Sequence, residues 1–479
     1  MPRFACLVVV LALGVFQLSV PDRLAAQSSL GPQVQEFVAV SAPVIALTHA
    51  TVIDGRGGPA VEDQTVILRG NRIEAVGSSE SVIVPEGSEV LDLTGKTLIP
   101  GLIMLHEHLF YTAGAGNYNT LGFSFPRLYL AGGVTTMRTG GSMMPYADIN
   151  LKRRIDSGRA LGPTMDVTAP YLNGPGLGIA GVKALEGPDD AVRMVDYWAG
   201  EGSTSFKAYM QISRAELGSA VEAAHARGLK VTGHLCSVTY SEAADLGIDN
   251  LEHGFTAATD FVADKQPDRC PSGEARTPSL LAVDLEGAAF RDLVAHLVEK
   301  GVAITSTNTV FETFTPGRPR ASDGALDAMA AEPRDSYLRR RAEIAVSNSS
   351  WDSLFTKNMA MEKAFHDAGG LLVVGTDPTG YGGVVAGYAN QRIIELLVEG
   401  GFTVPEAIKI ATLNGATYLG LEESTGTIAV GMEADLVVVD GDLAADVSRI
   451  SSMEIVFKDG VGFDSRRIFD SVKGTVGIR

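Results

Sequence analysis

The sequence is poor in cysteine and in positive charge, and each shortage excludes a class of protein. Only three cysteines occur in 479 residues, which excludes a small scaffold held together by disulfides. The 39 lysines and arginines are outnumbered by 57 aspartates and glutamates, and the net charge is -18. This balance argues against a nucleic-acid-binding surface. Two cysteines lie beyond the N-terminal segment: Cys236 falls in an apolar run and Cys270 in a polar loop, so a disulfide between them is the less favoured alternative.

Long hydrophobic runs are also scarce. The run at residues 4–20 is too short for a confident membrane span. It follows Arg3 and precedes Ala25 and Ala26, and this pattern predicts a secretory signal peptide over residues 1–26. An uncleaved anchor is the alternative. We therefore expect an exported protein, periplasmic or secreted, with no stable membrane span after cleavage.

Short β-rich runs occur near both ends of the chain and are separated by glycine-containing turns. They predict a small β-sandwich domain built from both termini, with residues 27–97 as its first part and residues 421–479 as its second. The runs lie at residues 44–52, 64–69, 72–76, 89–93, 435–440 and 453–458.

Between these ends, apolar strand runs alternate with helical patterns, which is typical of parallel βα units. The helical patterns at residues 215–227 and 290–300 each end in a glycine. We predict an α/β fold, a (β/α)8 TIM barrel over residues 98–420, with its active site where the strands end. Its eight strands are expected at residues 98–109, 134–139, 164–168, 203–210, 230–236, 250–255, 302–307 and 371–377.

One long segment, residues 311–350, interrupts this alternation after the seventh strand. Because long loops at the carboxyl ends of barrel strands often carry function, we expect a lid-like insertion or a substrate-binding element. A pair of surface helices without function is the alternative.

Two histidines, His106 and His108, end the first predicted barrel strand. Because side chains alternate along a strand, both imidazoles lie on one face and Glu107 points the other way. Taken alone, the pair is explained as well by one core and one surface histidine.

Four further residues at strand ends change that weighting. His234 and His253 supply neutral imidazoles that suit zinc and similar metals. Asp377 can bind a metal and accept a proton from water. Lys207 lies in an apolar strand, where a bare ammonium is costly to bury. It either pairs with a carboxylate or is carbamylated by carbon dioxide and becomes an anionic metal ligand.

In this order, the six residues resemble the metal-dependent amidohydrolase superfamily. The segments 224–234 and 247–254 resemble its imidazolonepropionase-like or dipeptidase-like branch, which includes exported dipeptidases and N-acyl-amino-acid hydrolases. The resemblance implies two divalent metal ions, zinc as the first choice. It implies that one ion is held by His106, His108 and Asp377, the other by His234 and His253, and that a carbamate on Lys207 bridges them.

The same resemblance implies that a hydroxide between the metals is the nucleophile and that Asp377 is the catalytic residue. Asp377 would deprotonate the water and pass the proton to the leaving nitrogen. His225 lies within the matching segment but in the middle of a predicted helix, so we regard it as structural. His49, His296 and His366 lie away from strand ends and are assigned no chemistry.

Substrate contacts are less well defined, because the residues after Lys207 depart from the pattern common in this branch. Tyr209 lies two residues beyond Lys207 on the same strand face, where it could polarise a carbonyl or sit in the core. Arg138 ends the second strand and is a candidate partner for a substrate carboxylate. Tyr111 and Tyr381 follow metal-ligand positions in loops and are weaker candidates.

The sequence therefore predicts a hydrolase that cleaves an amide or peptide bond of a small substrate, a dipeptide or an N-acyl amino acid. A mononuclear deaminase or cyclic-amide hydrolase is the alternative, and a barrel that binds ligands without catalysis is a remote one. We expect no nucleic-acid partner, and homo-oligomerisation is left open.

Overall fold

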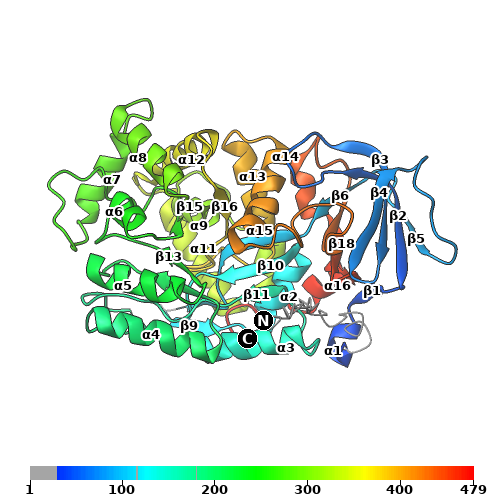
Figure 1. The fold of residues 1–479 in the computed structure, drawn as a ribbon, viewed down its shortest axis with the longest axis horizontal. Coiled ribbons are helices and arrows are strands. Elements are labelled where there is room, and N and C mark those ends of the chain that lie inside the picture. Colours follow the sequence, from blue (N-terminus) through cyan, green and yellow to red (C-terminus); the bar gives the residue numbers. More distant parts are fainter. Residues whose placement is uncertain (1–29, 115–116, 180) are drawn as a thin grey trace, which may run out of the picture.

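The computed structural model describes residues 30–114, 117–179 and 181–479 (Figure 1). The predicted signal peptide at residues 1–26 lies outside these ranges. Among the described residues, no helix has the length and apolar character needed to cross a membrane.

All eight strands predicted for the middle of the chain contain an observed parallel strand. They form one sheet of three strands and one of five. Isolated bridges from Thr168 to Ser205 and from Leu172 to Ala208 join the two sheets on one side. On the other side, the backbone N–H groups of Thr376 and Asp377 donate to the carbonyl oxygen of His106. A closed ring of strand hydrogen bonds is not seen within the described ranges. In spatial order, the strands are β7 (Leu102–Glu107), β10 (Val134–Thr139) and β11 (Thr164–Asp166), followed across the isolated bridges by β12 (Ser205–Ala208), β13 (Lys230–Gly233), β14 (Asn250–Glu252), β15 (Ala303–Ser306) and β16 (Leu372–Val374).

The prediction of one continuous barrel strand over residues 98–109 is wrong. This segment is divided at Gly101 into β6 (Lys96–Pro100), which pairs with strands from the chain ends, and β7, which pairs with β10. Glycine is required at the break because a Cβ atom on Gly101 would lie 2.2 Å from Oγ1 of Thr135. One continuous apolar run thus serves two sheets.

Segments from both ends of the chain form one hydrogen-bonded sheet of nine strands, drawn at the right of Figure 1. This sheet is what the structure shows of the predicted β-sandwich, and it encloses its own apolar cluster around Leu47, Leu68, Leu98, Val438 and Phe457. Its strands are β1 (Val38–Val40), β19 (Val461–Asp464), β18 (Met453–Lys458), β17 (Leu436–Asp440), β6, β2 (Val44–Val52), β3 (Val61–Arg69) and β4 (Arg72–Ser78), with β5 (Glu89–Asp92) paired to β2.

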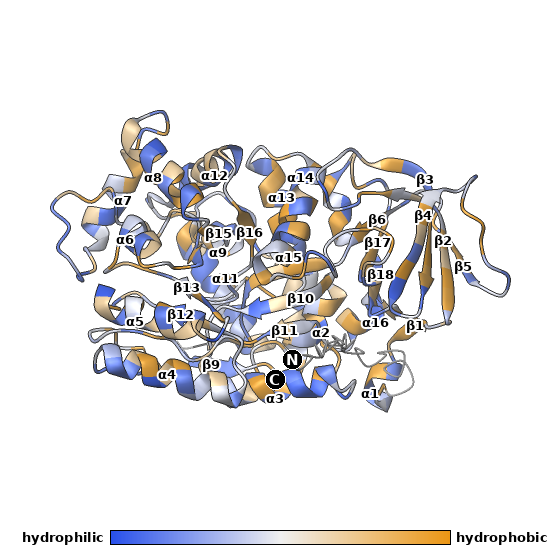
Figure 2. Ribbon diagram, viewed as in Figure 1, coloured by the Kyte–Doolittle hydropathy of each residue, from blue (hydrophilic) through white to orange (hydrophobic). Residues whose placement is uncertain are grey.

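Helices surround the parallel strands. The glycines predicted to end two helices are confirmed. Gly228 follows α5 (Arg214–His225) and Gly301 follows α8 (Ala288–Glu299), both at a φ of 69°, where a side chain would be strained. Along α4, hydrophilic and hydrophobic residues alternate as expected for a surface helix (Figure 2). The helices are α1 (Pro32–Gln35), α2 (Ser124–Ala131), α3 (Pro145–Asp156), α4 (Pro188–Glu201), α5 (Arg214–His225), α6 (Tyr240–Asp245), α7 (Gly273–Leu281), α8 (Ala288–Glu299), α12 (Trp351–Asp367), α13 (Tyr388–Glu399), α14 (Val404–Ile410), α15 (Leu413–Leu419), the 3-10 helix η3 (Val447–Ser451) and α16 (Ser465–Asp470).

The predicted insertion at residues 311–350 consists of α9 (Asn308–Phe314), α10 (Asp323–Ala328) and α11 (Ala331–Ala345). The C-terminal residues hold it in place through two backbone hydrogen bonds. The N–H of Val476 donates to the carbonyl oxygen of Ala328, and the N–H of Ala330 donates to the carbonyl oxygen of Val476. It also packs near the hairpin of β8 (Phe110–Gly114) and β9 (Asn117–Thr120). The residues near the C-terminus, beyond the last strand of the nine-stranded sheet, therefore contact the insertion.

The two cysteines outside the N-terminal segment are joined. Cys236 and Cys270 form a disulfide across 34 residues, with their Cα atoms 4.7 Å apart. The sequence favoured unpaired cysteines, and this expectation is wrong. The polar loop that carries Cys270 folds back onto the segment after β13, a contact that local sequence patterns do not report.

Candidate active site

Three of the predicted ligands form a compact group at the carboxyl ends of β7 and β16. His106, His108 and Asp377 each offer one ligand atom, and these atoms lie within 4.8 Å of one another. Nε2 of His108 is 3.1 Å and Nε2 of His106 is 3.6 Å from Oδ1 of Asp377. As predicted, Glu107 points away: its carboxylate accepts from the backbone N–H of Thr376 and the side-chain amide of Asn390.

The imidazoles are oriented by hydrogen bonds on their other nitrogen. Nδ1 of His106 lies 2.7 Å from Glu252, and Nδ1 of His253 lies 2.8 Å from the hydroxyl of Thr307. Nδ1 of His108 lies 3.3 Å from the carbonyl oxygen of Gly141. This pattern is the usual one for histidines that ligate metals, since it fixes the tautomer and turns Nε2 to the ion. The donor set therefore fits a divalent metal that accepts nitrogen and oxygen ligands.

His234 and His253 extend this group. The ring centroids of His253 and His106 are 4.7 Å apart, and those of His253 and His234 are 4.3 Å apart. Burial lowers the pKa of His108 to about 4 and that of His234 to about 3. These rings are neutral at neutral pH, which is the form that binds metal.

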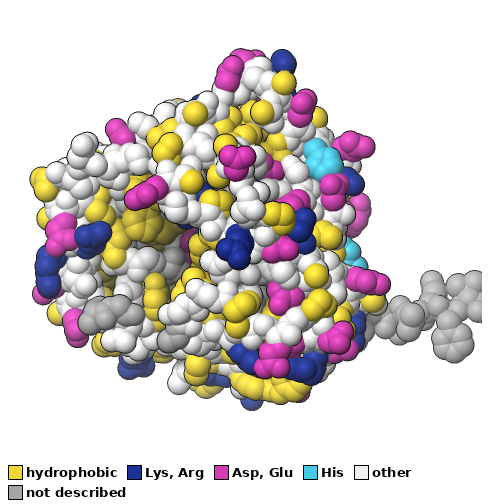
Figure 3. Space-filling model, turned by 90° about the vertical axis from the view of Figure 1, so that its left-hand side faces the viewer, with side chains coloured by type: hydrophobic (Ala, Val, Ile, Leu, Met, Phe, Trp, Pro, Cys, Tyr) yellow, Lys and Arg dark blue, Asp and Glu magenta, His cyan; other side chains and the backbone are white. Residues whose placement is uncertain are grey.

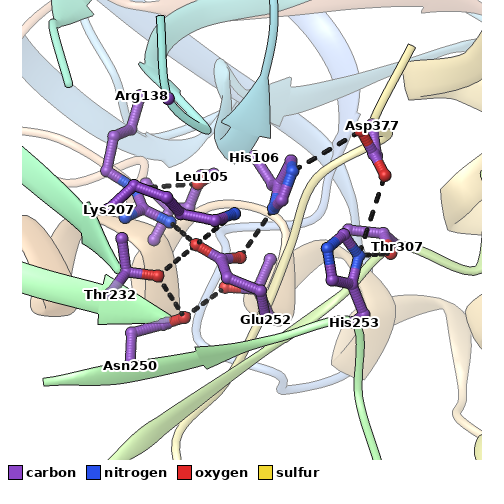
Figure 4. A network of polar contacts seen from close by, with 12 residues as sticks. Leu105, His106, Arg138, Lys207, Thr232, Asn250, Glu252, His253, Thr307 and Asp377 are labelled. Carbon is purple, nitrogen blue, oxygen red and sulfur yellow. Dashed lines mark hydrogen bonds and ion pairs between the residues drawn. The ribbon is translucent and has the colours of Figure 1, made fainter. Parts of the chain in front are cut away.

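Two of the candidate ligands have unusual backbones. His253 has a φ of 71° and Asp377 a φ of 52°, both in the left-handed region. Residues other than glycine are uncommon there, and such conformations cluster at functional sites. The backbone turns at the ends of β14 and β16 direct both side chains toward the same point (Figure 4).

Lys207, the sixth predicted ligand, is 1% exposed and lies on β12. Its Nζ is 3.7 Å from Oε1 of Glu252. Burial lowers the pKa of Lys207 to about 8, although the carboxylate of Glu252 acts in the opposite direction. The pairing with a carboxylate that the sequence left open is thus present, and the same lowered pKa favours the neutral amine that carbon dioxide would attack.

The comparisons with known proteins agree with this geometry. The Amidohydrolase family matches residues 97–462. The chain belongs to this family.

The relatives of this amidohydrolase have several activities. Adenine deaminase 3 of Rhizobium meliloti is 24% identical over 84% of the chain, but the match spans only 55% of that protein. Enamidase of Eubacterium barkeri is also 24% identical, over 84% of the chain and 90% of the enzyme. Several other curated relatives match only short segments, such as the 17% of an imidazolonepropionase from Idiomarina loihiensis.

Solved structures share the α/β fold of this amidohydrolase. A protein of Bifidobacterium longum named as a prolidase is 25% identical with a TM-score of 0.64, covering 90% of this chain and 98% of its own. A bottromycin amidohydrolase has a TM-score of 0.67 at 19% identity, covering 96% and 95% of the two chains. The family contains hydrolases of carbon–nitrogen bonds, and this chain is an enzyme of that class.

The sequence missed the residue at the centre of the amidohydrolase site, Glu252 on β14. Its fully buried carboxylate contacts His106, Lys207 and Arg138 and also accepts from the hydroxyl of Thr232 (Figure 4). One signal was available: a buried lysine needs a partner, and Glu252 stands in an apolar strand next to a candidate ligand.

The substrate contact predicted for Arg138 is not supported. Its guanidinium is fully buried, and it donates to Glu252 at 2.7 Å and to the carbonyl oxygen of Leu105 at 2.8 Å. Arg138 therefore lies behind the ligands, where it neutralises Glu252 and cannot face a substrate carboxylate.

The three predicted tyrosines are in different environments. Tyr111 is fully buried and its hydroxyl accepts from the backbone N–H of Gly383, which is a structural contact. Tyr381 donates to the carbonyl oxygen of Thr313. Tyr209 is partly exposed, and its ring centroid lies 5.1 Å from that of His234. Of the three, Tyr209 is the one placed to meet a ligand.

A second buried carboxyl lies behind His253. Glu362 on α12 is 1% exposed and accepts from the side-chain amides of Asn308 and Asn358, at 2.7 and 2.8 Å. Burial raises the pKa of Glu362 to about 7, although these hydrogen bonds act in the opposite direction. The folded protein therefore holds a proton that the unfolded chain releases near pH 4.5.

We expect Glu362→Gln to flatten the pH dependence of stability. Because the folded-state pKa is raised, the stabilising effect of this proton is complete below about pH 4.5 and is lost as pH rises through about 7. The wild-type free energy of unfolding should fall by on the order of 3 kcal/mol between pH 5 and 8 from this group. Urea titrations of both proteins at the two pH values measure it. Glu343→Gln, on the exposed face of α11, should leave the slope unchanged, and an equal slope in Glu362→Gln would contradict the assignment.

Proposed function

We propose that this amidohydrolase cleaves the amide or peptide bond of a small substrate, with dipeptides and N-acyl amino acids as the first class to test. The supporting observation is that three of the predicted ligands, His106, His108 and Asp377, converge at the carboxyl ends of parallel strands, with the rings of His253 and His234 next to them. That position is where a (β/α)8 barrel, the architecture we propose for the eight strands, carries its active site.

The residues would hold two divalent ions, zinc as the first choice. His106, His108 and Asp377 would hold one ion, His234 and His253 the other, and a carbamate of Lys207 would bridge them. Such ions polarise the scissile carbonyl group and lower the pKa of a water molecule.

The side chains of the protein supply the proton transfers. Oδ1 of Asp377 forms hydrogen-bond contacts with Nε2 of His108 at 3.1 Å and with the hydroxyl of Thr379 at 2.9 Å. Oδ2 is less constrained, with Nδ1 of His253 at 3.8 Å. Although burial opposes ionisation, His106 and the other histidines hold the pKa of Asp377 well below its usual range. We assign Oδ2 as the atom that takes the proton from the attacking water and returns it to the leaving nitrogen.

A mononuclear deaminase or cyclic-amide hydrolase is the second candidate. His106, His108 and Asp377 alone form a three-ligand group, and Lys207 pairs with Glu252 as an amine. The likeness to an adenine deaminase supports the same candidate.

We also propose that the protein is exported. The predicted signal peptide supports export, and so does the disulfide between Cys236 and Cys270, since disulfides persist in oxidising compartments.

Metal analysis combined with Lys207→Ala tests the proposed function. We expect two equivalents of metal in active protein and complete loss of amide hydrolysis after chelation. In Lys207→Ala we expect one equivalent or less and a fall in kcat/KM of about 100-fold or more, partly restored by a short carboxylate. The matched control is Lys230→Ala on the neighbouring β13, a lysine whose side chain is 44% exposed. One equivalent of metal in the wild type, with ammonia release from a ring substrate and an active Lys207→Ala, would favour the deaminase instead.

A further inference from the structure

Aromatic side chains lead outward from three of the candidate metal-binding histidines. From His253, the first series runs through Phe311 on α9, with 5.9 Å between ring centroids. Phe311 stacks on Trp351 at 5.3 Å, and Trp351 stacks on Phe314 at 5.4 Å. These rings come from α9 and from the start of α12, so they line the side of the site formed by the insertion.

Two further series begin at the other histidines. Phe110 lies 4.4 Å from His108, and Tyr118 lies 5.6 Å from Phe110. Tyr209 lies 5.1 Å from His234, and Tyr171 lies 4.8 Å from Tyr209. The aromatic residues follow β7, β11, β12 and β15, so they surround the ligands from several loops.

Part of this aromatic surface is accessible. Phe314, Trp351 and Tyr209 are half-buried, and Tyr118 is 38% exposed. Figure 3 looks onto the side of the molecule that carries α6, α7 and α8, opposite the nine-stranded sheet, and hydrophobic side chains gather there around a hollow. Accessible aromatic surface beside polar ligands is typical of a binding site for an apolar group.

The arginine and lysine side chains near these aromatic residues already form ion pairs or hydrogen bonds with other groups of the protein. Arg318 pairs with Glu312 and Glu399, and Arg341 donates to the carbonyl oxygens of Thr313 and Arg318. Lys265 donates to the carbonyl oxygen of Ser237. Arg138 is bound to Glu252 behind the site. A free substrate carboxylate would therefore lack the bidentate arginine that usually binds it.

We propose that the site selects substrates with an uncharged aromatic group next to the scissile carbon–nitrogen bond. This inference rests on the proposed hydrolytic function and narrows it to amides that need no free carboxylate, because stacking on the half-buried Trp351 and Tyr209 takes the place of carboxylate recognition. Offset or edge-to-face contacts between rings stabilise such a complex beyond the effect of buried area alone.

A panel of four amides tests the inference on metal-loaded enzyme: benzoylglycinamide, acetylglycinamide, benzoylglycine and acetanilide. We expect at least one of the neutral aromatic amides to be cleaved about 10-fold or more faster, as kcat/KM, than acetylglycinamide. Benzoylglycine should be cleaved with a kcat/KM no higher than that of benzoylglycinamide. Equal rates for acetylglycinamide and both neutral aromatic amides, or a 10-fold advantage of the free carboxylate, would overturn the inference.

Matched variants locate the preference. Trp351→Leu should lower the rate for the preferred aromatic amide about 5-fold or more and leave that for acetylglycinamide nearly unchanged. The control is Trp198→Leu on α4, where the tryptophan packs against Tyr146 and Tyr197 away from the histidines. A loss that is equal for both substrates in Trp351→Leu would indicate a structural role and contradict the proposal.

A binding measurement separates this inference from the proposed function. The chain has two tryptophans, so Trp198→Phe leaves Trp351 as the single tryptophan, which can be excited selectively at 295 nm or above. We expect its fluorescence to change with 4-phenyl-2-butanone, which has no carbon–nitrogen bond, and not with 2-butanone. A response without cleavage of any amide would support the aromatic site and overturn the proposed function. Amide cleavage without an aromatic preference and without a fluorescence change would support the proposed function and overturn the aromatic site.

Discussion

Asp377→Asn is expected to lower kcat/KM for the preferred amide by about 1,000-fold, because the variant loses both a metal ligand and the oxygen that accepts the proton. Asparagine is the informative substitution. Asp377 has a φ of 52°, and asparagine tolerates this left-handed conformation, whereas alanine would strain the turn after β16. Steady-state kinetics with metal analysis on the same samples measures the effect.

Asp63→Asn is the matched control for this variant. Asp63 also has a left-handed backbone, with a φ of 50°, but it lies on β3 and pairs with the exposed His49. It should keep full activity and metal content. If Asp377→Asn retained more than about a tenth of the wild-type kcat/KM, proton transfer would have to be assigned to another group.

Glu252→Gln is expected to affect stability and metal binding together. Its carboxylate is the ion-pair partner of the fully buried Arg138, and breaking a buried pair costs about 3–5 kcal/mol of unfolding free energy. It also holds Nδ1 of His106 at 2.7 Å. Loss of such an outer contact to a metal-binding histidine weakens metal affinity by about 10- to 100-fold. Urea unfolding and competition with a metal chelator measure the two effects.

Two further variants separate these effects. Glu312→Gln removes another buried carboxylate, which pairs with Arg318 and Arg392, and should lower stability without changing metal affinity. Adding Arg138→Met to Glu252→Gln removes the unpaired guanidinium and should restore part of the stability but not the metal affinity. If Glu252→Gln bound metal as tightly as the wild type, Glu252 would have no part in orienting His106.

The sequence by itself determined the order of elements and the candidate ligands. Eight apolar runs predicted eight parallel strands, because a strand buried on both faces must be apolar along its length. His106, His108, His234, His253 and Asp377 stood out because polar residues at the ends of such strands meet at one edge of a parallel sheet. These signals are local, since each depends on a few consecutive residues.

The tertiary structure decided which polar groups face the substrate and which lie behind the ligands. Arg138 and Tyr209 each ended a strand and were equivalent as candidates, yet Glu252 holds the first in the interior, while the second stays partly exposed beside His234. The division of one apolar run at Gly101 and the pairing of Cys236 with Cys270 also depend on contacts with distant segments. A buried charge requires a partner, but sequence spacing does not show which partner the fold brings to it. For this reason His106 and His108 could be recognised as half of a metal site from the sequence, whereas the carboxylate that orients His106 appeared only in the folded chain.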